Sequence, residues 1–354
     1  MTSTGAPGVC RAAGTHRLVG VLRLLDTRGG EEAAAVRPAH PGELRLLVSA
    51  RDRTGLGTVR VHLLADLIRR VAERRGLLVT VCDLAEAGGD LVSLRDACAA
   101  LNIHPPQHTM PPFLPAEELE ARLSALFPGG AGPAGGPGHA GAPLFDVLVA
   151  SVHGPGREDV AGWARLAAYC GHVTPAEGAE GTAASPRDVT ERGLDPLALR
   201  LALLRIRYRE PASLGWEMLH AAGKTLLRWR EEVAAWARSP SRPMSRRYFD
   251  AVIAAFDDNL DAHAALRQIS ALEGDAGEAD GTKFETFAAA DRLLGLDLAR
   301  DVGSAGPGGR PPGTPRLPAA VLAVASHGRR AVGPHGPRDR GVNRYRGFTP
   351  RHPP

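Results

Sequence analysis

Apolar and polar positions follow different patterns in the two halves of the chain, and the first half opens with strand-like runs around one helix-like stretch. The segments GELRLLVSA (42–50) and LLVTVCDL (77–84) are short apolar runs typical of buried strands. Between them, apolar residues recur on one face of a helix, and Gly76 is placed to end that helix. This face consists of Leu63, Leu64, Leu67, Ile68 and Val71. Strand, helix and strand in this order predict a βαβ unit and a doubly wound parallel sheet.

The rest of the first half adds further predicted elements. Residues 115–127 predict a helix with acidic residues in its first turn, residues 144–152 predict a strand, and residues 158–171 predict another helix. Residues 128–143 are rich in Gly, Ala and Pro and predict a flexible linker. We therefore expect residues 18–190 to form one Rossmann-like α/β domain.

The pattern changes at Asp195, which is placed to cap a helix that has Pro196 in its first turn. Amphipathic helical stretches then follow one another, so residues 195–300 predict an all-α helical bundle. Its expected core includes the tryptophans at 216, 229 and 236. The two ends of the chain, residues 1–17 and 303–354, are rich in small residues or in Pro, Gly and Arg, and both predict disorder.

The net charge of +4 is unevenly distributed. Residues 304–354 contain nine arginines and one acidic residue, Asp339, so this tail carries +8 and the remainder of the chain −4. Such a tail fits either an anionic partner such as RNA or a disordered solubilising end. In an RNA complex, Tyr345 and Phe348 would stack on bases while neighbouring arginines contact phosphates. The predicted nucleic-acid contacts are Arg338, Arg340, Arg344 and Arg346.

Cysteine usage and hydropathy bear on the compartment. The four cysteines are scattered without a C-x-x-C pair, which argues against a disulfide framework or a Cys-rich zinc site. No apolar signal segment follows the N-terminus, and the apolar run at residues 317–325 is too short to cross a bilayer. The sequence therefore predicts a cytoplasmic protein without a membrane partner.

The segment GLGTVR (55–60) lies between the first predicted strand and the helix that follows it. Two glycines before a helix N-terminus offer backbone N–H groups and the positive end of the helix dipole to a phosphate. The full G-x-G-x-x-G pattern is broken because Arg60 takes the place of its last glycine. Two interpretations stay open: a remnant nucleotide site formed by Gly55, Gly57, Thr58 and Arg60, or a purely structural corner.

The helical half resembles the cysteinyl-tRNA synthetases, a family of class I aminoacyl-tRNA synthetases. The segment DPLALRLALLRIRYREP (195–211) is similar to the family's D-x-x-A-L-R-x-x-L-L-x-x-x-Y-R-x-P pattern. The segment YFDAVIAAFDDNLDAHAAL (248–266) is similar to its F-x-x-A-L-x-D-D-L-x-T-x-x-A-L. A fainter likeness extends over residues 20–300. The resemblance implies a class I synthetase fold in trimmed form, with a doubly wound parallel sheet followed by a helical bundle, and ATP as the nucleotide.

The residues that carry the family's chemistry differ here. The family's H-I-G-H-A-R falls on residues 55–60, where Gly55 and Thr58 replace the two histidines that stabilise the phosphates of ATP. The first zinc-ligand cysteine falls on Ser49, and only His153 and Glu158 stand near the other ligands, so zinc is not expected. No lysine occurs between His172 and Asp195, where the family has K-M-S-K-S. No catalytic residue is therefore assigned.

Three hypotheses follow from this resemblance. The first is a paralogue with absent or much reduced adenylation activity, a pseudoenzyme that acts as a binding or regulatory protein, for instance through RNA. The second is an active ATP-dependent ligase of cysteine to tRNA or to a small amine. The third is a structural subunit that pairs with a protein partner through the helical bundle.

Overall fold

The computed structural model describes residues 21–28, 33–50, 55–85, 89–111, 114–127, 143–151, 160, 162–175 and 185–303. The predicted disordered end 1–17, the linker core 128–142 and the tail 304–354, with all four of its candidate RNA-binding arginines, lie outside these residues. The residues up to Gly303 form one compact unit.

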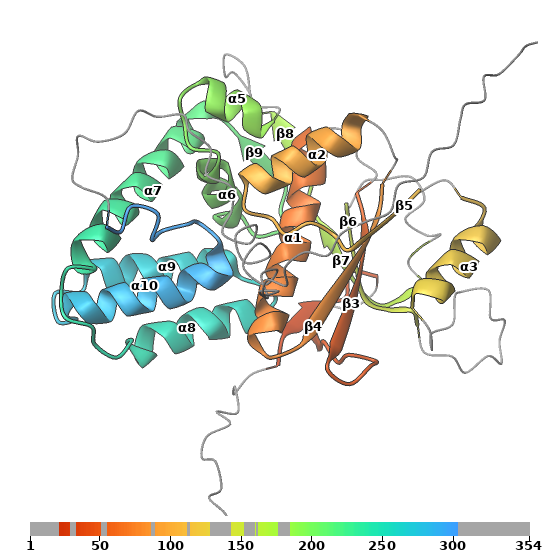
Figure 1. The fold of residues 1–354 in the computed structure, drawn as a ribbon, viewed down its shortest axis with the longest axis horizontal. Helices are drawn as coiled ribbons and strands as arrows, with labels where there is room; N and C mark the ends of the chain where they lie inside the picture. Colours follow the sequence, from red (N-terminus) through yellow and green to blue (C-terminus); the bar gives the residue numbers. More distant parts are fainter. Residues whose placement is uncertain are drawn as a thin grey trace, which may run out of the picture. The chain divides into compact units, whose positions relative to one another are not determined.

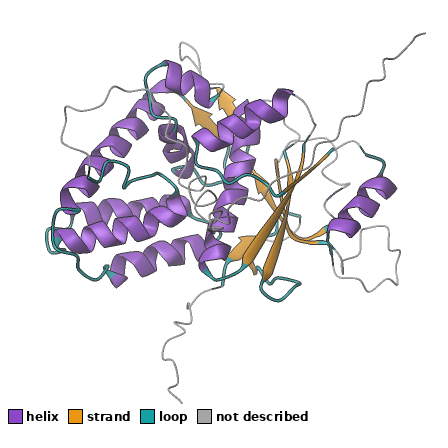
Figure 2. Ribbon diagram, in the orientation of Figure 1, coloured by secondary structure: helices purple, strands orange, loops and turns teal. Residues whose placement is uncertain are grey.

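A five-stranded parallel sheet forms the centre of the first half, as predicted (Figures 1 and 2). Its strand order is β5-β4-β3-β6-β7, so the chain moves outward from β3 first in one direction and then in the other. The strands are β3 (Glu43–Ser49), β4 (Leu78–Leu84), β5 (His108–Met110), β6 (Phe145–Ser151) and β7 (Ala164–Cys170). This order confirms the Rossmann-like, doubly wound fold class.

Helices cover both faces of this sheet. Helices α1 (Gly55–Arg74) and α2 (Gly89–Ala100) pack on the face formed by Leu44, Leu46 and Val48 of β3. Helix α3 (Ala116–Leu126) packs on the opposite face, where Leu47 of β3 points. The alternation along β3 follows from the two-residue period of a strand and explains why its sequence is apolar throughout.

The second half is helical, as the amphipathic pattern predicts. It contains α5 (Pro186–Glu191), α6 (Leu197–Leu204), α7 (Trp216–Trp236), α8 (Arg246–Asp257), α9 (Ala262–Gly274) and α10 (Asp280–Leu294). The predicted cap is present, because Oδ1 of Asp195 accepts a hydrogen bond from the backbone N–H of Leu197 at 2.8 Å. Trp229 and Trp236 are buried in one apolar core that is continuous with the face of the sheet covered by α1.

Two small sheets complete the described structure. Strands β1 (Arg23–Leu25) and β2 (Ala33–Ala35) pair antiparallel, and β8 (Val173–Pro175) pairs parallel with β9 (Ala212–Leu214). None of the helices in the described ranges is long and apolar enough to cross a bilayer.

The prediction of a helix at residues 158–171 is wrong, because residues Ala164–Cys170 form strand β7. The segment is rich in alanine, the strongest helix former, and its local pattern therefore favours a helix. In the structure it pairs with β6, and its residues alternate between the two faces: Ala168 and Cys170 point to the α1 side, Ala167 and Tyr169 to the α3 side. Pairing along a buried strand outweighs the intrinsic preference of alanine.

Candidate functional site

The candidate site lies at the carboxyl ends of the central strands, where β3 has β4 on one side and β6 on the other. Doubly wound sheets bind ligands at this switch point, beside the helix that follows the first strand. Ser49 ends β3, Asp83 stands one residue before the end of β4, and Ser151 ends β6. We call these three residues, together with the first two turns of α1 (55–62), the carboxyl edge. The segments 51–54 and 152–159 that continue from β3 and β6 lie outside the described residues.

The two glycines of GLGTVR are part of α1 itself rather than of a turn in front of it. The helix begins at Gly55, which has a positive φ of 31°, and Gly57 is buried within the first turn. No acidic residue stands in this turn. The first N–H groups of a helix have no partner inside it and lie at its positive end. Binding of a phosphate at Gly55, Gly57 and Thr58 accordingly stays a prediction.

Arg60, the fourth predicted nucleotide-binding residue, is 2% exposed and bonded to the chain itself. Its Nη1 donates to the carbonyl oxygens of Gly171 at 3.0 Å and Glu210 at 2.7 Å, and Nη2 donates to that of Arg207 at 2.9 Å. Burial lowers the pKa of this guanidinium, while the charges of Cys170 and Glu210 act in the opposite direction. Arg60 therefore ties α1 to the segments beside β8 and β9, and its donors are engaged there.

A buried ion pair that the sequence analysis missed lies directly behind this first turn. His62 is 5% exposed, and its Nδ1 lies 2.9 Å from the carbonyl oxygen of Thr58. Its Nε2 lies 3.0 Å from Oδ2 of Asp83, which is 1% exposed. Because a carbonyl and a carboxylate both only accept, the pair is best satisfied by a doubly protonated imidazolium. Burial disfavours that charge, but the Asp83 carboxylate outweighs it and raises the pKa of His62.

One atom of this pair has no partner among the residues that the structure describes. This atom is Oδ1 of Asp83, which is buried. The only sequence signal for the pair is an aspartate near the end of an otherwise apolar strand, since a charge in that position needs a partner.

The metal prediction concerns Ser49, His153 and Glu158. Ser49 is buried at the end of β3 with 5% exposure, whereas His153 and Glu158 lie outside the described residues. Within the ranges that the structure describes, no three His, Cys, Asp or Glu side chains converge as a metal site. Serine offers a hydroxyl where a zinc site of this type needs a thiolate.

Taken together, the switch point, the helix that begins at it and the bundle packed on that helix define a Rossmann-like α/β protein with a C-terminal helical region, the architecture of class I synthetases. The comparison with known proteins agrees with this class. Over 110 residues, 30% of the chain, it is 36% identical to an L-cysteine:1D-myo-inositol 2-amino-2-deoxy-alpha-D-glucopyranoside ligase of Streptomyces griseus. It is equally similar to the protein of the same name from Saccharopolyspora erythraea, with 36% identity over 109 residues.

A cysteine–tRNA ligase of Rhodopseudomonas palustris matches as well, with 28% identity over 124 residues, or 31% of the chain. The matched parts cover only about a quarter of these relatives, 26% of the first and 24% of the tRNA ligase. No protein-family model matches the chain. The similarity supports a likeness to the cysteinyl-tRNA synthetase family.

Proposed function

We propose that this chain is a cysteinyl-tRNA synthetase-like binding protein with little or no ability to form an aminoacyl adenylate. The proposal rests on one observation: both cationic side chains in the first two turns of α1 are buried and engaged within the chain. Arg60 donates to three backbone carbonyl groups, and His62 pairs with Asp83.

Adenylate formation develops negative charge on the phosphates of ATP, and enzymes stabilise it with preorganised donors and cations. By the resemblance, the family places two imidazoles at the positions of Gly55 and Thr58. A glycine offers no side chain there, and a threonine offers a neutral hydroxyl. The helix N-terminus alone supplies backbone donors and a partial charge, which suffices for weak phosphate affinity but not for the lost cationic groups.

A cysteine-dependent ATP–pyrophosphate exchange assay tests this proposal. We expect the exchange rate of the purified chain to equal that of the protein-free control, while an active cysteine–tRNA ligase assayed in parallel gives a clear signal. Exchange that requires cysteine and is lost in Thr58→Ala would refute the proposal. Zinc content is an independent check, because one tightly held zinc per chain would contradict the ligand positions inferred from Ser49.

The alternative is an active ligase that joins cysteine to an amine, and the names of the Streptomyces griseus and Saccharopolyspora erythraea relatives favour it. Under this alternative, ATP is the cosubstrate and the backbone N–H groups at Gly55 and Gly57 hold its phosphates. The exchange assay separates the two functions, because only the ligase forms an adenylate.

The partner of the binding protein is proposed to be tRNA or another RNA, contacted by Arg338, Arg340, Arg344 and Arg346, with a protein bound through the helical bundle as the alternative. A mobility-shift titration with tRNA at two salt concentrations tests the RNA proposal. Substituting the four arginines by glutamine should weaken binding and lower its salt dependence. Unchanged binding would assign the contact to another part of the chain.

A further inference from the structure

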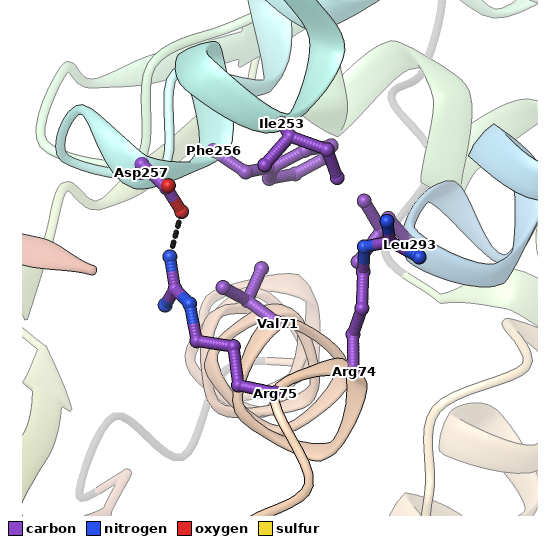
Figure 3. A pocket seen from close by; sticks show the side chains of 7 residues that line it. All are labelled: Val71, Arg74, Arg75, Ile253, Phe256, Asp257 and Leu293. Atoms are coloured by element: carbon purple, nitrogen blue, oxygen red, sulfur yellow. Dashed lines mark hydrogen bonds and ion pairs between the residues drawn. The ribbon is translucent and has the colours of Figure 1, made fainter. Parts of the chain in front are cut away.

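A small cavity lies between the C-terminal end of α1 and the helices α8 and α10 (Figure 3). Its volume is about 10 Å³, which is room for a single water-sized group. Val71, Ile253 and Leu293 supply apolar walls, while Arg74 and Arg75 reach it from α1. Val71, the first residue of α1 at the cavity, comes nine residues after His62 at the end of the carboxyl edge, which is about 14 Å along the helix, so the cavity is a separate site.

The two arginines at the cavity differ in their interactions. Arg75 forms an ion pair with Asp257 of α8, drawn as the dashed line in Figure 3. Arg74 stands on the other side of the opening, next to Leu293. Its guanidinium lies 4.5 Å from the centre of the Phe249 ring, which holds it in place by a cation–π contact.

Arg74 has no hydrogen bond or ion pair with any residue that the structure describes, and its Nε is buried without a partner. It therefore donates nothing to the last carbonyl groups of α1, which is the usual role of an arginine at a helix C-terminus. A buried N–H without an acceptor is destabilising, so an acceptor at this place would be favourable.

Further positive charge surrounds this guanidinium. Burial lowers the pKa of Arg74, and the charges of Arg292 and Arg75 lower it further, against the smaller opposite effect of Asp250 and Asp257. Arg292 is exposed on the last turn of α10 and pairs with no described carboxylate. Since neither Arg74 nor Arg292 forms an ion pair with a described carboxylate, these two like charges favour the uptake of an anion.

We propose that this cavity binds the oxyanion of a phosphate or carboxylate group, with one oxygen between Arg74 and the apolar walls and the rest of the group at the mouth beside Arg292. The cavity volume fits one oxygen of such a group. Arg75 cannot compete for the group because Asp257 holds it. An arginine suits this task because its fork of N–H groups matches two oxygens of one oxyanion.

Titration of the full chain with inorganic phosphate, followed by thermal unfolding at constant ionic strength, tests the proposal. A ligand that binds only the folded state raises Tm, and above its Kd the rise grows with the logarithm of the ligand concentration. We expect this rise for the wild type, with binding about tenfold weaker in Arg74→Met and also weakened in Arg292→Met. Acetate in place of phosphate shows whether the site accepts a carboxylate, and a response to either oxyanion that is weakened in Arg74→Met supports the proposal.

The matched control is Arg122→Met on α3, which also removes one arginine and should leave the titration unchanged, because Arg122 pairs with Glu118 on the surface. The basic tail is present in every variant, so phosphate bound there does not distinguish them. A wild type whose Tm does not rise with either anion would overturn the proposal, as would an Arg74→Met protein that responds like the wild type. If Arg74→Met does not fold, Arg292→Met decides, since this exposed substitution should fold, and an unchanged response would overturn the proposal.

Discussion

Substitution of Arg200 tests how the helical half is held on the sheet. Arg200 of α6 is fully buried, and its Nη2 donates to Oδ2 of Asp66 on α1 at 2.8 Å. The same guanidinium donates to the carbonyl oxygen of Leu294 at 2.6 Å and to that of Leu101 at 2.9 Å. One side chain thus joins α1, the end of α2 and the end of α10. Arg200→Met keeps most of the volume and removes all of these bonds.

The expected loss follows from what remains around Asp66. Removing one partner of a buried ion pair costs about 3–5 kcal/mol when the other charge is left uncompensated. Here Arg70 still donates to Oδ2 at 2.7 Å, and Nδ1 of His104 still lies 2.6 Å from Oδ1. Burial disfavours the charge of Asp66, but Arg200, His104 and Arg70 together hold its pKa far below the ordinary value. Since two of the three partners of Asp66 persist, we expect Arg200→Met to lower the free energy of unfolding by about 3 kcal/mol.

Urea unfolding followed by far-ultraviolet circular dichroism measures this loss. The control is Arg187→Met, because Arg187 pairs with Glu191 on the surface with 84% of its side chain exposed. Such a pair contributes about 0.3–0.5 kcal/mol. If Arg200→Met and Arg187→Met unfold at the same urea concentration, the inferred role of Arg200 is wrong.

Three further predictions concern buried groups. The pKa of His62 is raised in the folded state, so its ion pair stabilises the fold fully below the ordinary pKa of about 6.5, and this stabilisation is lost as pH rises through the raised pKa. The urea concentration at the unfolding midpoint should therefore fall from pH 6 to 9 in the wild type and fall less in His62→Gln. Equal falls in the two proteins would contradict the ion pair with Asp83. Gly171→Ala should lower stability by about 1–3 kcal/mol in thermal unfolding, because its Cβ would strike the Glu210 backbone, and an unchanged Tm would argue against this close approach. Burial raises the pKa of Cys82 and Cys98 to about 12 and that of Cys170 to about 11, so mass spectrometry should find all three unmodified after native iodoacetamide treatment at pH 8, and rapid labelling would contradict their burial.

The parts of the fold that the sequence predicts correctly are those with a strong local period. Strands β3 and β4 are uninterrupted apolar runs, α1 has a single apolar face, and Gly76 ends it with a positive φ of 79°, as expected of a helix C-terminus. Strand β7 was missed because its alanines have no strand signature. Helix α2 and the three-residue strands were missed because short or weakly amphipathic segments show no clear periodic pattern of apolar residues.

The contacts that define the candidate site could not be predicted in this way. His62 and Asp83 are 21 residues apart, Arg60 reaches carbonyls 111 and 150 residues away, and Arg200 reaches Asp66 over 134 residues. No local pattern encodes such pairs, because the fold alone brings them together. The sequence could place Arg60 at the start of α1 but could not show that the chain itself occupies its donors.

The central claim is that the carboxyl edge does not support adenylate formation, and single-turnover formation of cysteinyl adenylate tests it most directly. The purified chain, in excess over ATP radiolabelled at its α-phosphate, is mixed with magnesium and cysteine. Labelled cysteinyl adenylate, together with the AMP released by its hydrolysis, is quantified over time. We predict that cysteine causes no formation of either product above the rate seen without it. A cysteine-dependent burst of these two products approaching one per ATP, absent in Thr58→Ala, would contradict the account.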